Sequence, residues 1–273
     1  MKVGLRAHDY GKHTAKQLAK LIVADGFETV QLAIPKAIQG IEGFGDISQK
    51  HLEEIQESFQ KNKVDIAVLG CYIEPSLGDS VLRKSQVDIY LQALKHGKFL
   101  GATMVGTETT HFAYPEGERA KYFEILVDSV KRMVDEAERL DIWVGIEPVK
   151  AHTLATPELT RELIERVDSD KLKIILDPVN MLGVNEMDQQ EEVWKKCIRY
   201  FGDWVEVLHI KDVRVKNGVF VPTVLGEGCV DYREIAKWAC KEKQHIGVLR
   251  EELNPQYAQK DFNYLKNFVQ AKL

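Results

Sequence analysis

The chain has 273 residues, of which 44% are hydrophobic and 29% are charged. This composition is typical of a folded globular protein and excludes an intrinsically disordered chain. The 42 aspartates and glutamates outnumber the 37 lysines and arginines, which gives a net charge of −5. Because no run of basic residues occurs either, we expect no nucleic-acid partner.

We expect neither a membrane partner nor secretion. No apolar stretch approaches the roughly 20 residues that cross a bilayer. The first residues, MKVGLRAHDYGK, lack the apolar core of a signal peptide. The four cysteines form no CxxC pair, so neither a zinc ribbon nor a thioredoxin-type motif is predicted. These features together predict a cytoplasmic protein with reduced thiols.

Short segments that favour β-strands alternate with helical segments along the whole chain. Several of them are almost continuously apolar, as parallel strands covered on both faces are. The predicted strands are Val3–Ala7, Thr29–Ala33, Asp65–Leu69, Met104–Thr107, Trp143–Glu147, Lys173–Leu176, Val205–Ile210 and Gly247–Glu251.

Capping signals mark the helices between these strands. Ser48 and Thr156 each precede a segment with helical spacing of apolar residues, and each is expected to cap its helix. Asp231, followed by Glu234, predicts a capping box at the start of a later helix. Gly101 is expected to end a helix in the left-handed conformation.

The strand starts recur about every 25 to 40 residues, which is the length of a βα unit. Eight units without a leftover segment predict an α/β protein with a single (β/α)₈ TIM barrel domain over residues 1–273. A doubly wound sheet is the alternative. The turn after the first strand, HDYGKH, contains neither phosphate-binding glycine pattern that such a sheet favours.

The active site of a barrel lies at the carboxyl ends of its strands. The polar residues at the ends of predicted strands five to eight are Glu147, Asp177, Asn180, His209, Lys211, Asp212, Glu251 and Glu252. Carboxylates at the ends of buried strands are costly when unpaired, and no cluster of arginines accompanies them. A divalent metal ion is therefore the expected neutralising partner. Carboxylates with one imidazole suit Mn²⁺, Mg²⁺, Co²⁺ or Zn²⁺ equally well.

The order and spacing of five short motifs resemble one known family. IEPV, LDPVN, LHIKD, the later GEG and the final glutamate pair are similar to motifs of sugar and sugar phosphate isomerases and epimerases among the xylose isomerase-like TIM barrels. The resemblance covers nearly the whole chain. It implies that the metal ligands are Glu147, Asp177, His209 and Glu251.

Two positions depart from the family's ketose 3-epimerases, and one ligand has a neighbour of the same type. Asn180 and Val215 stand where those enzymes have a histidine and an arginine that contact substrate. The substrate of the ketose 3-epimerases is therefore not inferred for this protein. Side chains alternate along a strand, so only one of Glu251 and Glu252 points into the barrel. The family pattern favours Glu251, which turns Arg250 toward the helix layer.

The resemblance implies a divalent-metal-dependent isomerase or epimerase that forms a metal-stabilised enediolate from a small-molecule sugar or sugar phosphate, with Glu147 and Glu251 as acid and base. Lys211 either binds a substrate oxygen or phosphate or pairs with a barrel carboxylate. Whether the protein is a homo-oligomer is left open. Further substrate-binding candidates are Asn180, Glu108 and His8.

Three other functions compete with this hypothesis. A metal-dependent dehydratase of a polyol-derived keto compound, such as inosose or dehydroshikimate, would use the same ligands. A zinc-dependent abasic-site endonuclease would need additional histidines, whereas the ends of strands two to four offer Gln31 or Ala33, Cys71 and Glu108. The complete ligand set argues against a non-catalytic sugar-binding barrel.

Overall fold

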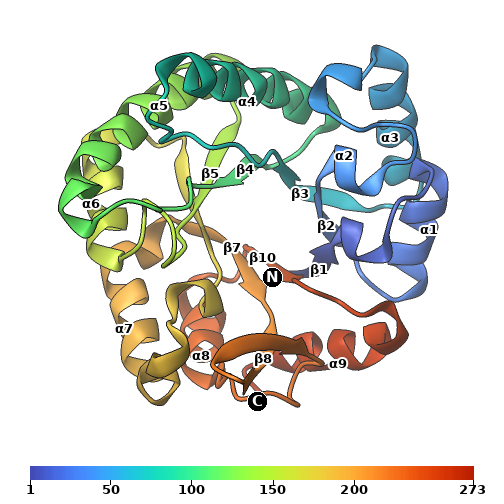
Figure 1. Ribbon diagram of the computed structural model, residues 1–273. Helices are drawn as coiled ribbons and strands as arrows, with labels where there is room; N and C mark the ends of the chain where they lie inside the picture. The colour runs from blue at the N-terminus through green and yellow to red at the C-terminus, as the bar shows by residue number, and fades with distance from the viewer.

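The computed structural model describes residues 1–273 and contains a closed barrel of eight parallel strands in the order β1-β10-β7-β6-β5-β4-β3-β2. Helices surround the barrel (Figure 1). The predicted TIM barrel is thus confirmed, and every predicted strand boundary is correct to within one residue. The barrel strands are β1 Lys2–Arg6, β2 Thr29–Leu32, β3 Asp65–Gly70, β4 Met104–Glu108, β5 Trp143–Glu147, β6 Leu172–Leu176, β7 Val205–Ile210 and β10 Gly247–Arg250.

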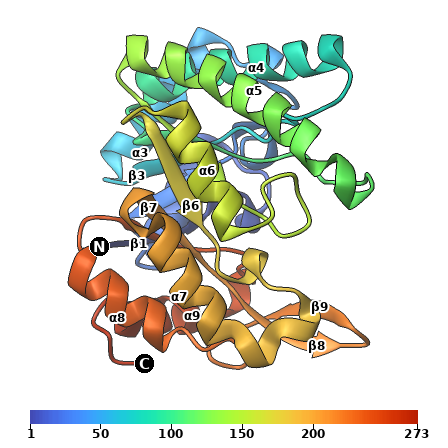
Figure 2. The same ribbon diagram turned by 90° about the vertical axis from the view of Figure 1, so that its left-hand side faces the viewer.

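The helices lie around the outside of the strands (Figure 2), and their buried apolar residues belong to the main hydrophobic core. The Ser48 and Thr156 side chains accept hydrogen bonds from backbone N–H groups in the first turns of α3 and α6, as predicted. Gly101 ends α4 with a φ of 73°. No helix is both long enough and apolar enough to span a membrane. The α-helices are α1 Ala15–Ala24, α2 Ile34–Ala37, α3 Gln49–Lys61, α4 Ser80–Leu100, α5 Arg119–Leu140, α6 Pro157–Val167, α7 Gln190–Phe201, α8 Arg233–Glu242 and α9 Ala258–Phe268.

The capping box predicted at Asp231 is wrong. Helix α8 begins at Arg233, and Tyr232 occupies the N-cap position without a side-chain cap. The Asp231 carboxylate instead accepts a hydrogen bond from the Arg233 backbone N–H and forms an ion pair with the Arg233 guanidinium. This local pairing holds Asp231 in the loop before the helix.

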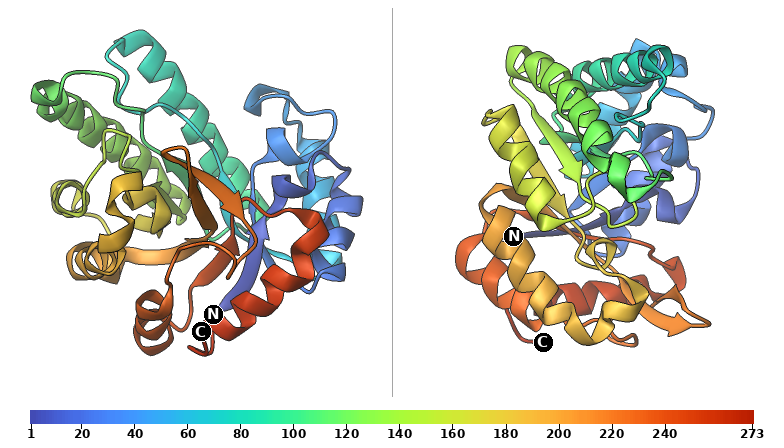
Figure 3. Two further views of the ribbon diagram at one scale, coloured as in Figure 1. Left: turned by 60° about the horizontal axis from the view of Figure 1, so that its bottom comes forward. Right: turned by 60° about the vertical axis from the view of Figure 1, so that its left-hand side comes forward.

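A second, antiparallel sheet that the strand analysis did not predict follows β7. It consists of β8 Asp212–Lys216 and β9 Val219–Thr223 and forms a hairpin that projects from the barrel rim (Figures 2 and 3). Asn217 and Gly218 at its tip have φ values of 53° and 75°. Such a pair favours the type I′ turn of two-residue hairpins. The Asn-Gly pair between valine-rich segments is therefore a sequence signal for this element.

The base of the hairpin is held by the carboxylate of Asp212. This carboxylate accepts hydrogen bonds from the backbone N–H groups of Val213, Gly226, Gly228 and Val230, at 2.8 to 3.2 Å. Asp212 is buried, so these bonds satisfy a charge that would otherwise be costly. The Asp of LHIKD and the GEG motif therefore form one structural unit.

A buried ion pair provides the second anchor of the hairpin. Arg250 Nε lies 2.6 Å from Asp261 Oδ2 in α9, and both side chains are buried. Arg250 also donates to the Thr223 carbonyl at the end of β9, at 2.8 Å. The backbone N–H of Leu225 donates to Asp261 at 2.8 Å. Arg250 thus faces the helix layer, as predicted.

We expect Gly228→Ala to destabilise the protein by about 1 to 3 kcal/mol, the usual cost of overpacking. An added Cβ would lie 2.0 Å from Asp212 Oδ1 and 2.5 Å from the Val213 carbonyl oxygen. Urea unfolding measures the loss. The matched control is Gly45→Ala, because no atom lies within 4 Å of its added Cβ. Equal stability of the two variants would contradict the role of Gly228.

Candidate metal centre

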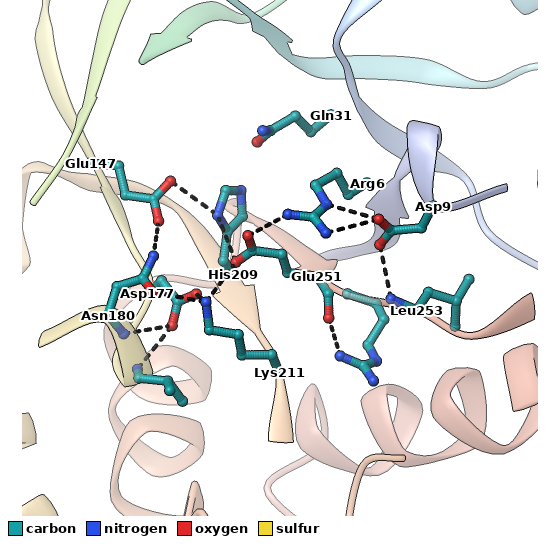
Figure 4. A network of polar contacts seen from close by, with 12 residues as sticks. Arg6, Asp9, Gln31, Glu147, Asp177, Asn180, His209, Lys211, Glu251 and Leu253 are labelled. Atoms are coloured by element: carbon teal, nitrogen blue, oxygen red, sulfur yellow. Dashed lines mark hydrogen bonds and ion pairs between the residues drawn. The ribbon is translucent and has the colours of Figure 1, made fainter. Parts of the chain in front are cut away.

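The four predicted ligands converge at the carboxyl end of the barrel (Figure 4). Glu147 ends β5, Asp177 follows β6, His209 belongs to β7 and Glu251 follows β10. One nitrogen or oxygen of each can be chosen so that all lie within 4.8 Å of one another, and all four residues are buried. Neighbouring strands of one barrel therefore bring together residues that are far apart in the sequence.

A short turn orients the carboxylate of Asp177. Pro178 follows it, and Val179–Met181 form a 3₁₀ turn. Asp177 Oδ1 accepts hydrogen bonds from the backbone N–H groups of Val179, at 2.8 Å, and Asn180, at 3.2 Å. This leaves Oδ2 directed into the cluster, 2.9 Å from Lys211 Nζ. The LDPVN motif thus presents one carboxylate oxygen to the site.

Asn180 connects two charged groups of the site. Its Nδ2 donates to Glu147 Oε1 at 2.7 Å, and its Oδ1 accepts from Lys211 Nζ at 2.8 Å. Both ends of the amide are therefore engaged, and the second oxygen of Glu147 remains directed toward His209 (Figure 4).

His209 shows that the cluster fits a metal ion. Its Nδ1 lies 3.3 Å from Glu147 Oε2 and 3.8 Å from Glu251 Oε2, yet neither ring nitrogen makes a hydrogen bond. Buried polar atoms without partners are rare, and a buried imidazole facing carboxylates is a common metal ligand. Burial alone would lower the His209 pKa. The negative charges of Glu147, Glu251 and Asp177 outweigh burial and raise the His209 pKa to about 9.

Two cations, one lysine and one arginine, also enter the site and balance part of the carboxylate charge. Lys211 Nζ lies 2.9 Å from Asp177 Oδ2 and 3.3 Å from Glu251 Oε2. Arg6, at the end of β1, lies 2.6 Å from Glu251 Oε1 and is itself paired with Asp9 at 2.9 Å. Of the two interpretations of Lys211, the structure shows the carboxylate pairing. Arg6 was missed although it is the polar residue that ends β1.

These charges act differently on two of the carboxylates. Burial raises the pKa of Asp177 well above its ordinary value. Burial also opposes ionisation of Glu251, but Lys211, His209 and Arg6 outweigh it and hold the Glu251 pKa below its ordinary range. Glu251 is therefore a firmly charged member of the cluster.

The neighbouring Glu252 does not belong to the cluster. Its φ of 60° turns the chain away from the regular strand, and its side chain is half-buried beside a groove outside the four-residue group. The structure thus places Glu251 in the cluster and Glu252 outside it, which agrees with the expected choice of Glu251.

Glu108 and His8, the other substrate-binding candidates, lie outside the four-residue cluster. Glu108 is in register with Glu147 across β4 and β5, and its Oε2 lies 3.7 Å from His152 Nδ1. Burial, together with Glu147, raises the Glu108 pKa to about 7. Burial lowers the pKa of His8 to about 3, and its buried Nδ1 has no hydrogen-bond partner. His8 is therefore neutral.

The family profile described as xylose isomerase-like TIM barrel matches residues 19–268. The chain belongs to this family. This agrees with the resemblance of the five motifs. No curated protein sequence matches the chain.

Several solved structures share the fold of this xylose isomerase-like barrel at low identity. A D-tagatose 3-epimerase-like protein has a TM-score of 0.79 and 20% identity, with 100% of this chain and 98% of that chain covered. A xylose isomerase-like TIM barrel protein from Mycobacterium smegmatis in complex with magnesium has a TM-score of 0.76 and 18% identity. The match covers 100% of this chain and 98% of that chain. The probable 3-DHS dehydratase AsbF from Bacillus anthracis has a TM-score of 0.74 and 16% identity. The match covers 98% of this chain and 99% of that chain.

We expect Glu251→Gln to weaken Mn²⁺ binding more than about 100-fold, which exceeds the usual cost of losing an outer-shell partner. The amide removes a charged oxygen from the cluster while preserving side-chain volume. Calorimetric titration of metal-free protein measures the affinity. Glu252→Gln is the matched control and should bind within about threefold of the parent protein. The reverse order of the two variants would assign the ligand to Glu252.

Metal binding should release protons in a pH-dependent manner. At pH 7, below the His209 pKa of about 9, the metal-free ring is protonated, and it must lose that proton to bind a cation. The number of protons released therefore falls as the pH rises through 9, and affinity rises. Calorimetry in buffers of different ionisation enthalpy measures the release. A release that stayed constant from pH 7 to 10 would contradict this assignment.

The same raised pKa predicts how the stability of the metal-free protein depends on pH. The charged His209 ring stabilises the folded state fully below its ordinary pKa of 6.5, and this contribution is lost as the pH rises through about 9. Urea unfolding of metal-free protein should therefore show a falling free energy of unfolding over this interval, and His209→Gln should flatten the decline.

Proposed function

We propose that this protein is a divalent-metal-dependent sugar isomerase or epimerase. The observation that carries the proposal is the buried cluster of Glu147, Asp177, His209 and Glu251, in which the imidazole lacks hydrogen-bond partners. The epimerase-like structural neighbour supports the same chemistry. The substrate we propose is a small sugar, because such a molecule offers the neighbouring oxygens that bind a hard cation.

The four clustered residues would hold the cation. A cation bound there supplies a Lewis acid that stabilises negative charge on substrate oxygens while a neighbouring carbon loses its proton. Glu147 ends β5 and Glu251 follows β10, and β6 and β7 lie between these two strands. One carboxylate would remove the proton while the other returns it. Lys211 and Asn180 would orient substrate oxygens beside them.

The apolar floor of the site supports this chemistry by excluding water. Ala67, Val68, Met104, Ile175, Val207 and Leu249 form a buried cluster inside the barrel. Leu249 is in register with His209, and Val207 lies two residues before His209 on the same face of β7, so this layer lies next to the clustered residues. A poorly hydrated site strengthens each electrostatic contact that the substrate makes.

A dehydratase is the second candidate, since the probable 3-DHS dehydratase from Bacillus anthracis has the same fold. It would also begin by removing a proton beside a carbonyl, but it would then expel a hydroxyl group. The residues of the cluster do not separate the two reactions. The products do, because only the dehydratase forms an unsaturated compound.

The test is a panel of ketoses and aldoses incubated with Mn²⁺-loaded protein in deuterated water. We expect a new stereoisomer or positional isomer, with deuterium at a carbon beside the carbonyl, and at least about a hundredfold lower rate after Glu147→Gln. Product identity is measured together with exchange, because direct proton transfer can keep the label out. Metal removal with a chelator is the control. Unsaturated products would favour the dehydratase, and turnover without metal would contradict both.

A further inference from the structure

A groove lies beside the metal centre, between the β8–β9 hairpin and the loops that follow β5 and β6. It has a volume of about 410 Å³, and pockets of about 300 to 1,000 Å³ hold small-molecule ligands. Asn180 and Lys211 line the groove and also contact the clustered carboxylates (Figure 4). The groove therefore continues from the site, and a substrate at the metal centre can extend into it.

The hairpin gives the groove an apolar wall. Phe220 and Pro222 are two residues apart on β9 and so share one face of the hairpin. Val213 is the register partner of Pro222 and belongs to the same face. All three residues line the groove. Because Phe220 is half-buried and Pro222 is exposed, a ligand can still cover apolar surface on this wall.

Two polar side chains of the lining have hydrogen-bonding capacity to spare. Glu252 is half-buried, and its carboxylate accepts no hydrogen bond and forms no ion pair. Asn180 Nδ2 donates one hydrogen to Glu147, and its second N–H has no acceptor in the chain. The groove therefore offers both an acceptor and a donor to the hydroxyl groups of a ligand.

Neither a phosphate nor a wholly apolar group matches this lining. Lys211 is already paired with two clustered carboxylates, and Lys150 is paired with Glu186, so the one unpaired charge is the negative charge of Glu252. A phosphate would be repelled by it. A wholly apolar group would cover the carboxylate without donating a hydrogen bond. A sugar ring, which has C–H groups on its faces and hydroxyl groups at its edge, satisfies both the wall and the carboxylate.

The chemistry proposed for the metal centre limits how such a ring can be attached. Proton removal requires a carbon beside a carbonyl, because the carbonyl oxygen takes up the negative charge. The sugar unit at the metal centre must therefore keep its carbonyl carbon free of a glycosidic bond. A second ring can then be linked only through one of the hydroxyl groups of the first.

We propose that the groove binds the second ring of a reducing disaccharide whose carbonyl-bearing unit lies at the metal centre. The proposal rests on the sugar chemistry proposed above and names its substrate class. One face of the second ring packs on the wall of Val213, Phe220 and Pro222. Its hydroxyl groups donate to Glu252 and accept from the free N–H of Asn180.

The test uses reducing α-glucosylfructoses that differ only in their linkage: trehalulose, turanose, maltulose, leucrose and isomaltulose. Ligand-observed NMR measures their dissociation constants from Mg²⁺-loaded protein beside that of D-fructose. At least one disaccharide should bind at least about tenfold tighter than D-fructose, because its second ring covers apolar surface and donates to a charged carboxylate. Each has a free carbonyl, so the same compounds also serve in the proton-exchange assay.

Two variants remove the contacts of the second ring. Phe220→Ala removes part of the wall and Glu252→Ala removes the acceptor, and each should reduce the disaccharide preference to less than about threefold. Val219→Ala is the matched control, because Val219 precedes Phe220 on β9 but is 56% exposed and does not line the groove. It should keep the preference. Calorimetric titration with Mn²⁺ verifies that the metal centre of each variant is intact.

Three results would overturn the inference. The first is that no disaccharide binds tighter than D-fructose. The second is tighter binding of fructose 6-phosphate or 6-O-benzyl-D-fructose than of every disaccharide, which would assign the groove to an anion or to an apolar group. The third is a disaccharide preference that both Phe220→Ala and Glu252→Ala retain in full.

The two proposals fail separately. A disaccharide preference that depends on Phe220 and Glu252, without proton exchange or isomerisation of any sugar, supports the groove assignment and contradicts the proposed function. Metal-dependent isomerisation of monosaccharides without a disaccharide preference supports the proposed function and overturns the groove assignment.

Discussion

The structure depends on burying several carboxylates at one end of the barrel. Glu147, Asp177 and Glu251 cannot lie together in an apolar strand layer unless positive charge balances them. Lys211 and Arg6 supply part of that charge, and the raised pKa of His209 supplies more by keeping its ring protonated. A divalent cation would replace the His209 proton. The cluster is therefore held together without a metal ion, and a cation bound there would compete with the proton for one ring.

Most of the barrel and the rim position of the clustered residues follow from one sequence rule. Parallel strands covered on both faces are continuous apolar runs, so their limits are visible in the sequence. The polar residue that ends such a run must lie at the carboxyl rim. The rule places Glu147, Asp177 and His209 near the rim among eight polar candidates, and the family resemblance selects them as ligands. The rule selects Glu251 over Glu252 only with strand alternation and the family pattern added.

The contacts among these residues could not be predicted in the same way. The side chains of Lys211 and Arg6 are long, so their positions at strand ends do not determine which carboxylate they reach. The start of α8 could not be predicted, because the Asp231 carboxylate binds both the backbone N–H and the side chain of Arg233 and lies one residue before the N-cap, Tyr232. The β8–β9 hairpin is different, because its Asn-Gly turn is a local signal.

Alternation along two strand ends links the site to the β8–β9 hairpin. On β7 and just beyond it, His209 and Lys211 enter the site, while Asp212 turns the other way and binds the loop after the hairpin. Beyond β10, Glu251 enters the site, while the preceding Arg250 reaches Asp261 and Thr223. Neighbouring residues therefore divide two tasks between opposite faces of a strand. The same two strand ends therefore position both the clustered residues and the anchors of the hairpin.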